Sequence, residues 1–222
     1  MATSDNPWLS IPLADYLGHM GHPRVGQLAI LREAFAETLG TAHPTSVLVL
    51  GCTDGNGLDC IDPRVTRHVT AVDINPGYLE NLRDAHGTRG FELTTTCADA
   101  MQLAYPTRGF DLIYAGLILE YLAWESLLPR LAEALTIDGR LSVVIQVPSV
   151  REPAVSATPY TSLLRLEPIF SFVQPAQLDR VATSIGLKSE HARLRTTASG
   201  KQLACIDFRR AAHPNERLGE EG

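Results

Sequence analysis

The sequence has few cysteines and no long apolar segment. Its four cysteines, Cys52, Cys60, Cys97 and Cys205, show no C-x-x-C spacing, so the sequence indicates neither a zinc site nor a redox motif. No apolar run approaches the ~18 residues of a membrane-spanning helix, and the N-terminus lacks the basic and apolar regions of a secretory signal. We therefore expect a cytoplasmic protein with reduced thiols and no membrane partner.

Lysine is scarce, and positive charge is not in excess. Only Lys188 and Lys201 among the 19 basic residues are lysines, and the net charge is -6. An acidic chain has no overall attraction for nucleic acid, so we expect no nucleic-acid partner. The sequence also has no P-loop, no H-E-x-x-H and no spacing that indicates a Ser-His-Asp triad. NTPase, metalloprotease and hydrolase functions are therefore without support, and no metal site is predicted.

What the sequence does contain is an apolar strand that ends in a glycine-rich turn. Residues 47–50 are four consecutive apolar residues between Ser46 and Gly51, a pattern typical of a strand covered on both faces. The glycines at positions 51, 55 and 57 allow a tight turn in which the backbone can approach a ligand closely. The pattern predicts a ligand site just after this strand.

An acidic residue follows the turn at a spacing that indicates a ribose site. Asp73 ends a second predicted strand, 67–73, and lies 22 residues after Gly51, close to the ~20 residues at which a carboxylate accepts hydrogen bonds from both ribose hydroxyls. The dinucleotide pattern G-x-G-x-x-G fails because of Thr53 and Asn56. Since that pattern seats a pyrophosphate on a helix N-terminus, the sequence favours a nucleoside without phosphates over NAD.

Strands and helices alternate along the rest of the chain. The further predicted strands are 91–97, 109–115 and 140–147, and the predicted helices are 13–19, 25–39, 78–86, 123–135 and 175–185. This alternation is the signature of a mostly parallel α/β sheet with helices on both faces. Two strands, 186–195 and 202–210, complete a set of seven. Only six residues separate them, too few for a crossover helix, so they are predicted to be antiparallel neighbours.

This order of segments, from about Ser46 to Arg210, resembles the class I S-adenosylmethionine-dependent methyltransferases, in particular their small stand-alone bacterial members. The resemblance implies a Rossmann-like, doubly wound α/β fold, S-adenosyl-L-methionine as cofactor and S-adenosyl-L-homocysteine as product. It places the ribose at Asp73, the adenine beside Asp99, and the reacting methyl group beside the motif at 110–121. The cofactor-binding residues that it implies are Gly51, Cys52, Thr53, Gly55, Gly57, Asp73, Ile74, Asp99, Ala100, Ala115 and Gly116.

Six residues are candidates for the acceptor side of the site. They are Glu120, Tyr121, Tyr16, His19, Tyr160 and Gln146. The first two follow the fourth strand, the next two lie in an N-terminal helical segment, and Gln146 ends the fifth strand. Tyr160 lies in the loop at 148–175, which follows the edge of the sheet where ligands of open α/β folds bind.

Several of these candidates also have a structural interpretation. Glu120 either orients an amine acceptor or acts as a base, or it is an acidic residue that stabilises a helix N-terminus. Tyr16 and His19 either contact substrate, since such N-terminal helices often close over the cofactor in this family, or pack between two helices. The loop at 148–175 is either a wall of the acceptor pocket or a connection packed in the core.

We predict a single domain, 1–222, with an N-terminal helical cap at 1–45, a methyltransferase-like core at 46–210 and a loose tail at 211–222. The resemblance implies methyl transfer to a small molecule, for which the cap and the loop could enclose a pocket. We expect a monomer or a homodimer.

Other functions remain open at this point. The same scaffold can use S-adenosylmethionine without methyl transfer, by cyclising or eliminating the donor. A cofactor-binding module without catalysis is a further alternative, because Val49 and Thr53 stand where the family usually has an acidic residue and a glycine. An NAD-dependent oxidoreductase fits least, because the pyrophosphate pattern is missing.

Overall fold

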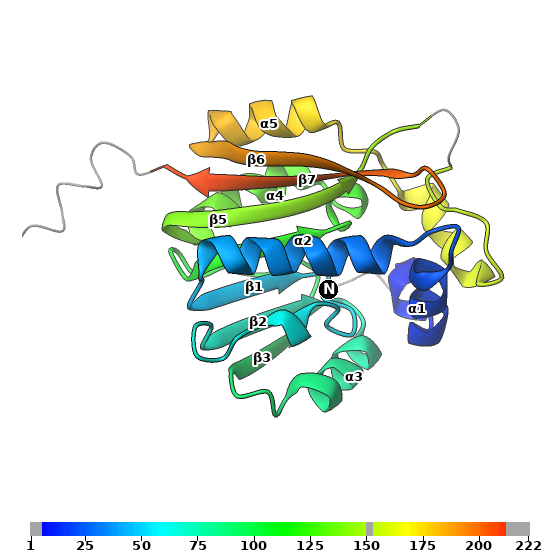
Figure 1. Ribbon diagram of the computed structural model, residues 1–222, viewed down its shortest axis with the longest axis horizontal. Coiled ribbons are helices and arrows are strands. Elements are labelled where there is room, and N and C mark those ends of the chain that lie inside the picture. The colour runs from blue at the N-terminus through cyan, green and yellow to red at the C-terminus, as the bar shows by residue number, and fades with distance from the viewer. Residues whose placement is uncertain (1–5, 150–152, 212–222) are drawn as a thin grey trace, which may run out of the picture.

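The computed structural model of the protein describes residues 6–149 and 153–211. Their centre is a seven-stranded sheet in the order β3-β2-β1-β4-β5-β7-β6 (Figure 1). Its strands are β1 (Ser46–Leu50), β2 (His68–Asp73), β3 (Glu92–Cys97), β4 (Phe110–Gly116), β5 (Leu135–Gln146), β6 (Leu187–Thr196) and β7 (Gln202–Arg210). Apart from Ala211, the predicted tail at 211–222 lies outside the described residues.

The sheet is mostly parallel and finishes in an antiparallel pair. β2 and β4 are parallel to β1, β3 is parallel to β2, and β5 is parallel to β4. β7 runs antiparallel to both of its neighbours, β5 and β6. The predicted fold class and the predicted hairpin are therefore confirmed. Because Gln146 at the end of β5 pairs with Leu203 near the start of β7, the residue before β7 lies at the carboxyl edge of the parallel strands.

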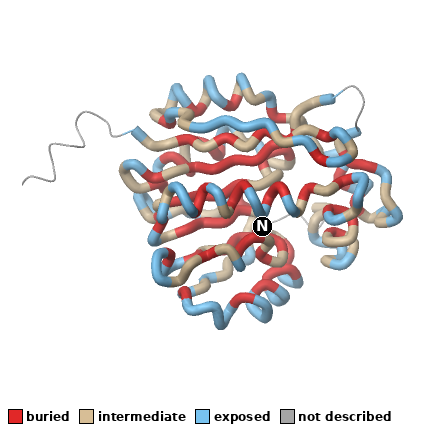
Figure 2. Tube along the Cα trace, in the orientation of Figure 1, coloured by how far each residue is buried: buried red, intermediate tan, exposed pale blue. Residues whose placement is uncertain are grey.

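Helices cover both faces of the sheet, as predicted. The α-helices are α1 (Leu13–Gly21), α2 (Gln27–Ala42), α3 (Pro76–His86), α4 (Trp124–Ala134) and α5 (Pro175–Ser184), and the 3-10 helices are η1 (Pro7–Ser10), η2 (Leu58–Cys60), η3 (Leu119–Tyr121) and η4 (Thr161–Ile169). Successive residues of β1 point to opposite faces. Val47 packs in one buried cluster with α2 and α3, while Leu48 packs in the other with α4 and α5. Figure 2 shows the central strands as the most continuously buried part of the chain.

β5 begins earlier than its sequence pattern predicts. The strand was predicted to start at residue 140, but Asp138 and Gly139, a common turn sequence, lie within it, and Asp138 has a left-handed φ of 63°. The pairing with β4 shifts there, because Phe110 pairs with Leu135 whereas Leu112 pairs with Arg140. The residues before Asp138 thus extend β5 at its beginning. Asp138 and Gly139 do not start the strand but form an irregularity within it.

In the structure, α1 and the segment around η4 meet over the carboxyl ends of the strands, at the right of Figure 1. These two segments together form the cap of the pocket. The hydroxyl of Ser162 in η4 donates to the Asp15 carboxylate of α1 at 2.6 Å. The Tyr160 ring lies directly on Gly18, where an added Cβ would stand 2.2 Å from the ring. The Tyr78 hydroxyl of α3 donates to the Ile11 carbonyl at 2.9 Å, so α3 holds the N-terminal part of the cap as well.

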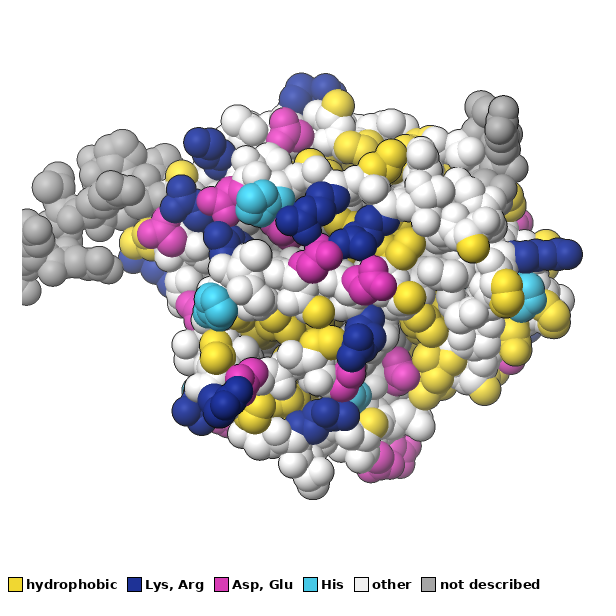
Figure 3. Space-filling model, viewed as in Figure 1, with side chains coloured by type: hydrophobic (Ala, Val, Ile, Leu, Met, Phe, Trp, Pro, Cys, Tyr) yellow, Lys and Arg dark blue, Asp and Glu magenta, His cyan; other side chains and the backbone are white. Residues whose placement is uncertain are grey.

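The face drawn in Figure 3 carries interspersed positive and negative side chains. Arg193 and Arg195 of β6 both pair with Glu37 of α2, and Arg195 also pairs with Glu33 at 3.0 Å. These ion pairs join the edge of the sheet to α2. Within the part of the chain that the structure describes, no helix is both long and apolar enough to cross a membrane.

Candidate cofactor and acceptor site

A pocket opens at the carboxyl edge of the sheet, beneath the cap. It encloses about 1120 Å³ of empty space, part of which is open to solvent. Its walls come from the ends of β1, β2, β4 and β5, the segments that follow β3 and β4, and the cap. Ligands of open α/β sheets bind at this edge. The pocket is therefore the candidate functional site.

Asp73 joins the glycine turn to the end of β2. One oxygen of its carboxylate accepts the backbone N–H of Thr53 at 2.9 Å, and the other accepts that of Asn75, also at 2.9 Å. The backbone N–H groups of Gly51 and Cys52 donate to the Val72 carbonyl at 2.9 and 3.1 Å. Asp73 is only 7% exposed, and burial raises its pKa. The turn is thus held against β2 by three hydrogen bonds, donated by Gly51, Cys52 and Thr53, with the carboxylate at the pocket wall.

The backbone of the turn explains its composition. Gly51 has a φ of 64°, and an added Cβ would stand 2.8 Å from the Ile118 side chain. Gly57 has a φ of 93°, and an added Cβ would stand 2.9 Å from the Phe35 ring. Thr53 also has a left-handed φ, 47°, although it is β-branched. Such a conformation is rare for a β-branched residue, so this position keeps a backbone geometry that a glycine would adopt without strain.

The segment after β3 forms another part of the wall. One oxygen of the Asp99 carboxylate accepts the backbone N–H of Met101 at 2.8 Å, which closes a tight turn. Arg130 of α4 donates to the Met101 carbonyl at 2.8 Å and so fixes this turn to the helix. Asp99, Ala100 and Ile74 all line the pocket. This part of the wall lies next to Asp73.

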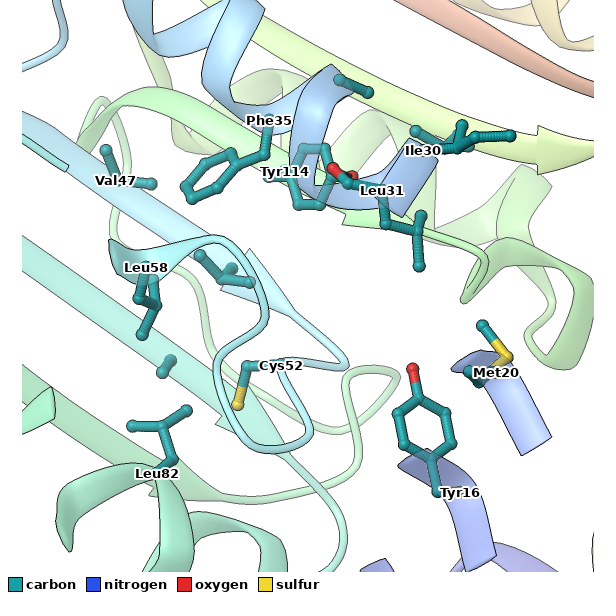
Figure 4. Close-up of a cluster of buried hydrophobic side chains, with 14 of the residues drawn as sticks. Tyr16, Met20, Ile30, Leu31, Phe35, Val47, Cys52, Leu58, Leu82 and Tyr114 are labelled. Carbon is teal, nitrogen blue, oxygen red and sulfur yellow. Dashed lines mark hydrogen bonds between the residues drawn. The ribbon is translucent and has the colours of Figure 1, made fainter. Parts of the chain in front are cut away.

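The residues that the resemblance assigns to the cofactor divide into two groups. Those that line the pocket are Gly51, Thr53, Asp73, Ile74, Asp99, Ala100 and Gly116. The others, Cys52, Gly55, Gly57 and Ala115, do not line it. The Cys52 side chain points away from Tyr16 and packs in the core near Leu82 (Figure 4). Ala115 is buried against the opposite face of the sheet, with α4.

Four of the acceptor candidates line the pocket: Tyr16, His19, Tyr121 and Gln146. Tyr16 projects from α1 beside Met20 (Figure 4), and burial raises the pKa of its phenol. His19 is buried, and its Nδ1 lies 2.9 Å from the Thr158 hydroxyl. Burial, with the nearby charge of Lys201, lowers the His19 pKa to about 4. His19 is therefore neutral at pH 7.

Glu120 does not line the pocket; it lies behind the pocket wall. Its side chain is 1% exposed, and one carboxylate oxygen accepts the backbone N–H of Gln146 at 2.7 Å. The other oxygen has no hydrogen-bond partner among the described residues. Burial raises the Glu120 pKa to about 7. Glu120 thus contacts the end of β5 without reaching the pocket. Of Glu120 and Gln146, only Gln146 presents its side chain to the pocket.

Tyr160 also lies outside the pocket wall, since its ring packs on Gly18. Other residues of the same loop do line the pocket. Val155, Leu163, Leu166 and Phe170 line the pocket, so the loop at 148–175 forms part of the wall and contains a 3-10 helix that the sequence pattern did not predict.

Several residues that line the pocket were not among the predicted site residues, and they include Trp8, Gln27 and Lys201. The Trp8 ring packs edge-on against Tyr121, with centroids 5.1 Å apart. The Gln27 amide donates to the Gln146 side chain at 3.4 Å, and Gln146 in turn donates to the Ala154 carbonyl at 3.2 Å. The signal available for Lys201 was its rarity, because it is one of two lysines in the chain.

No metal centre is formed by the residues that the structure describes, because no group of three or more His, Cys, Asp or Glu side chains is arranged to hold an ion. The titratable groups that line the pocket instead surround a space suited to an organic ligand.

A sheet of this order, with a carboxylate that closes a glycine turn at its carboxyl edge, is the arrangement of a Rossmann-like α/β domain. Residues 47–139 match the methyltransferase-domain family. This match covers less than half of the chain, and it agrees with the family that the sequence motifs indicated.

A curated methyltransferase is similar to part of the chain. The malonyl-acyl-carrier-protein O-methyltransferase of Herminiimonas arsenicoxydans is 31% identical over 111 residues, which are 48% of this chain and 39% of that protein. The match thus spans well under half of this curated relative.

Two solved structures share the fold over most of the chain. The N-methyltransferase NodS from Bradyrhizobium japonicum, in complex with S-adenosylhomocysteine, has a TM-score of 0.69 at 17% identity, covering 94% of this chain and 100% of that one. The 1,6-didemethyltoxoflavin-N1-methyltransferase from Burkholderia thailandensis has a TM-score of 0.67 at 18% identity, covering 90% and 87%. At these identities the likeness shows the fold alone.

Proposed function

We propose that the pocket binds S-adenosylmethionine and that the protein transfers a methyl group to a small-molecule acceptor. The observation that carries the proposal is the placement of Asp73, whose carboxylate fastens the glycine turn and also lines the pocket. Each of its oxygens accepts one backbone N–H. Since a carboxylate oxygen has about two acceptor sites, both oxygens can still accept a hydroxyl of a ribose.

The neighbouring wall fits the rest of a nucleoside. Ile74 and Ala100 offer apolar surface for a base, and Asp99 keeps acceptor sites for an exocyclic amine. Gly51 and Gly116 keep the wall free of side chains, since an added Cβ would meet Ile118 at 2.8 Å at the first position and Leu31 and Tyr114 at 3.0 Å at the second. In this proposal Cys52, Gly55 and Gly57 act by setting the shape of the turn, and Ala115 acts by packing the sheet beneath it.

The acceptor is proposed to lie between the ends of β4 and β5 and the cap. S-adenosylmethionine supplies an electrophilic methyl group on a sulfonium, so the protein's task is to align the acceptor and exclude water. Tyr16, Tyr121 and Trp8 provide aromatic walls for this purpose, and aromatic faces also suit a cationic donor.

Two polar residues have proposed roles toward the acceptor. His19 is neutral at pH 7, because its pKa is lowered to about 4, so one ring nitrogen can accept a proton from a hydroxyl or ammonium acceptor. Gln146 is proposed to hydrogen-bond the acceptor. Glu120 holds the backbone of Gln146, and Tyr160 holds the cap closed on Gly18; both are positioning residues in this proposal.

A small molecule is favoured as the acceptor because the cap covers the pocket. Leu163, Leu166 and Val155 supply apolar walls on the acceptor side, and an enclosed apolar pocket with few polar groups is typical of small-ligand sites. The net charge of -6 gives no reason to expect a nucleic-acid substrate.

The test is a product analysis. The purified protein is incubated with S-adenosylmethionine that carries a deuterated methyl group and with a panel of small alcohols, phenols, amines, thiols and acids, and all products are identified by mass spectrometry. The proposal predicts an acceptor that gains the labelled methyl together with S-adenosylhomocysteine. Labelled fragments of the donor without a methylated acceptor would show cyclisation or elimination instead. Binding of the donor without any product would support a non-catalytic module.

A further inference from the structure

Two glutamines lie together in the part of the pocket that the proposed cofactor residues do not form. Gln146 ends β5, and β1 and β4 separate that strand from β2, which ends at Asp73. Gln27 is the first residue of α2, and its side-chain amide contacts that of Gln146 at 3.4 Å. Both side chains line the pocket. We call this part of the pocket its acceptor end, and the part lined by Asp73 and Asp99 its cofactor end.

A backbone carbonyl fixes the orientation of both amides. The Gln146 side chain contacts the Ala154 carbonyl at 3.2 Å, and Lys201 donates to the same carbonyl at 3.1 Å. Since a carbonyl oxygen only accepts, Gln146 must present its amide nitrogen to Ala154 and its oxygen to Gln27. That oxygen also only accepts, so Gln27 presents its nitrogen to Gln146. Turning either amide over would place like atoms against each other.

The two amides are held by regular elements of the fold. Gln27 is 5% exposed and Gln146 is 3% exposed. The backbone N–H of Gln146 donates to the Glu120 carboxylate at 2.7 Å, and Gln146 pairs with Leu203 of β7. Gln27 is carried by the first turn of α2. The amide pair is therefore preorganised on a strand and a helix, which place ligand-binding groups more accurately than loops do.

The pair keeps unused hydrogen-bonding capacity of both kinds. A side-chain amide has two N–H donors and an oxygen with two lone pairs. The contacts above use one N–H of each amide and one lone pair of the Gln146 oxygen. Among the residues that the structure describes, the Gln27 oxygen accepts no hydrogen bond. The acceptor end thus offers an accepting oxygen on Gln27 together with one remaining N–H on each glutamine.

We propose that Gln27 and Gln146 are specificity-determining residues that bind an amide-type group of the acceptor, with an N–H beside a C=O as in a carboxamide or a lactam. The inference rests on the proposed function and narrows its substrate class to neutral amides. The N–H of such a group donates to the Gln27 oxygen, and its C=O accepts from the remaining N–H groups.

Other polar groups match the glutamine pair less completely. A carboxylate or an ester only accepts, and an ammonium only donates, so each leaves buried atoms of Gln27 or Gln146 unpaired, which costs free energy. A hydroxyl both donates and accepts, but through a single oxygen. An amide has its donor and its acceptor on separate atoms and can therefore reach both side chains. Val155, directly after Ala154, lines the pocket and supplies apolar surface for the rest of the ligand.

The test compares ligands that differ in one N–H. Wild-type protein, Gln27→Met and Gln174→Met are saturated with S-adenosylhomocysteine, and that binding is measured first. Gln174 is the matched control, because it is exposed before α5 and does not line the pocket. Each complex is then titrated calorimetrically with three lactam–lactone pairs: δ-valerolactam and δ-valerolactone, carbostyril and coumarin, and isocarbostyril and isocoumarin. Each lactone keeps the shape of its lactam and replaces the N–H by an oxygen.

Benzamide is compared in the same way with benzoate and with benzyl alcohol. Loss of S-adenosylhomocysteine binding by the wild type would contradict the proposed function itself, separately from this inference.

The inference predicts that wild type binds at least one lactam more tightly than its lactone, by roughly 10- to 100-fold. Gln27→Met abolishes that preference, and Gln174→Met keeps it. The wild-type comparison stands alone if Gln27→Met does not fold. Equal binding of lactam and lactone in every pair, no binding of any lactam at millimolar concentration, or a lactam preference that survives in Gln27→Met would overturn the inference. Tighter binding of benzoate or benzyl alcohol than of benzamide would overturn the amide assignment.

Discussion

Replacing Glu120 with Gln should make the protein more stable than the wild type above neutral pH. Burial raises the Glu120 pKa from an ordinary 4.5 to about 7. The unfolded chain therefore loses this proton at lower pH than the folded protein does. Stability contributed by the group is complete below the unfolded pKa, falls as the pH rises from 4.5 to about 7, and stays low above that. The pKa difference corresponds to about 3 kcal/mol of unfolding free energy.

The amide variant preserves the contacts of the protonated acid. Its carbonyl oxygen can still accept the Gln146 N–H, the bond that measures 2.7 Å in the wild type. Both the protonated acid and the amide place a donor where the unpartnered carboxylate oxygen lies. Wild type and Glu120→Gln should therefore have similar stability at acid pH and diverge as the pH rises.

Urea unfolding between about pH 5 and pH 8 measures this divergence directly. Glu80→Gln, at an exposed position on α3, is the control for a change of net charge and should follow the wild-type pH profile. If the difference in unfolding free energy between Glu120→Gln and wild type did not change with pH, Glu120 would have the same pKa in both states. The conclusion that its charge is excluded from the folded interior would then be wrong.

Two further substitutions test the pocket and its cap. Asp73→Ala removes the acceptor of two backbone N–H groups and of the proposed ribose hydroxyls; it should weaken S-adenosylhomocysteine binding by about 10- to 100-fold in calorimetry, and unchanged affinity in a folded variant would refute the proposed ribose site. Gly18→Ala places a Cβ 2.2 Å from the Tyr160 ring, whereas a Cβ at Gly40 meets nothing within 4 Å. Gly18→Ala, unlike Gly40→Ala, should speed S-adenosylhomocysteine release in stopped-flow experiments, and equal release rates would show that the Tyr160 contact does not hold the cap.

Local patterns predicted most of the sheet. The apolar run at 47–50 and the short link before β7 are properties of adjacent residues, and they are sufficient for a buried parallel strand and an antiparallel pair. The start of β5 was not predicted, because Asp138 and Gly139 form a standard turn sequence. Only the pairing of Leu135 with Phe110 makes this turn an irregularity within a strand.

The cofactor end of the site was also accessible from sequence, because its geometry depends on spacing within one strand–turn–strand unit. The placement of Asp73 against Thr53 follows from that unit. The acceptor end is assembled from distant segments. Gln27 meets Gln146 across 119 positions, and Lys201 meets Ala154 across 47. No local pattern reports such contacts, and none indicates that Glu120 is buried behind the pocket wall.

The central claim is that the pocket at the end of β1 and β2 is a site for S-adenosylmethionine. Calorimetric titration of the wild-type protein with S-adenosylmethionine, S-adenosylhomocysteine and NAD tests it most directly. The account predicts one site per chain for both sulfur nucleosides, with micromolar affinity, and no binding of NAD. Binding of NAD alone, or of none of the three ligands, would contradict it.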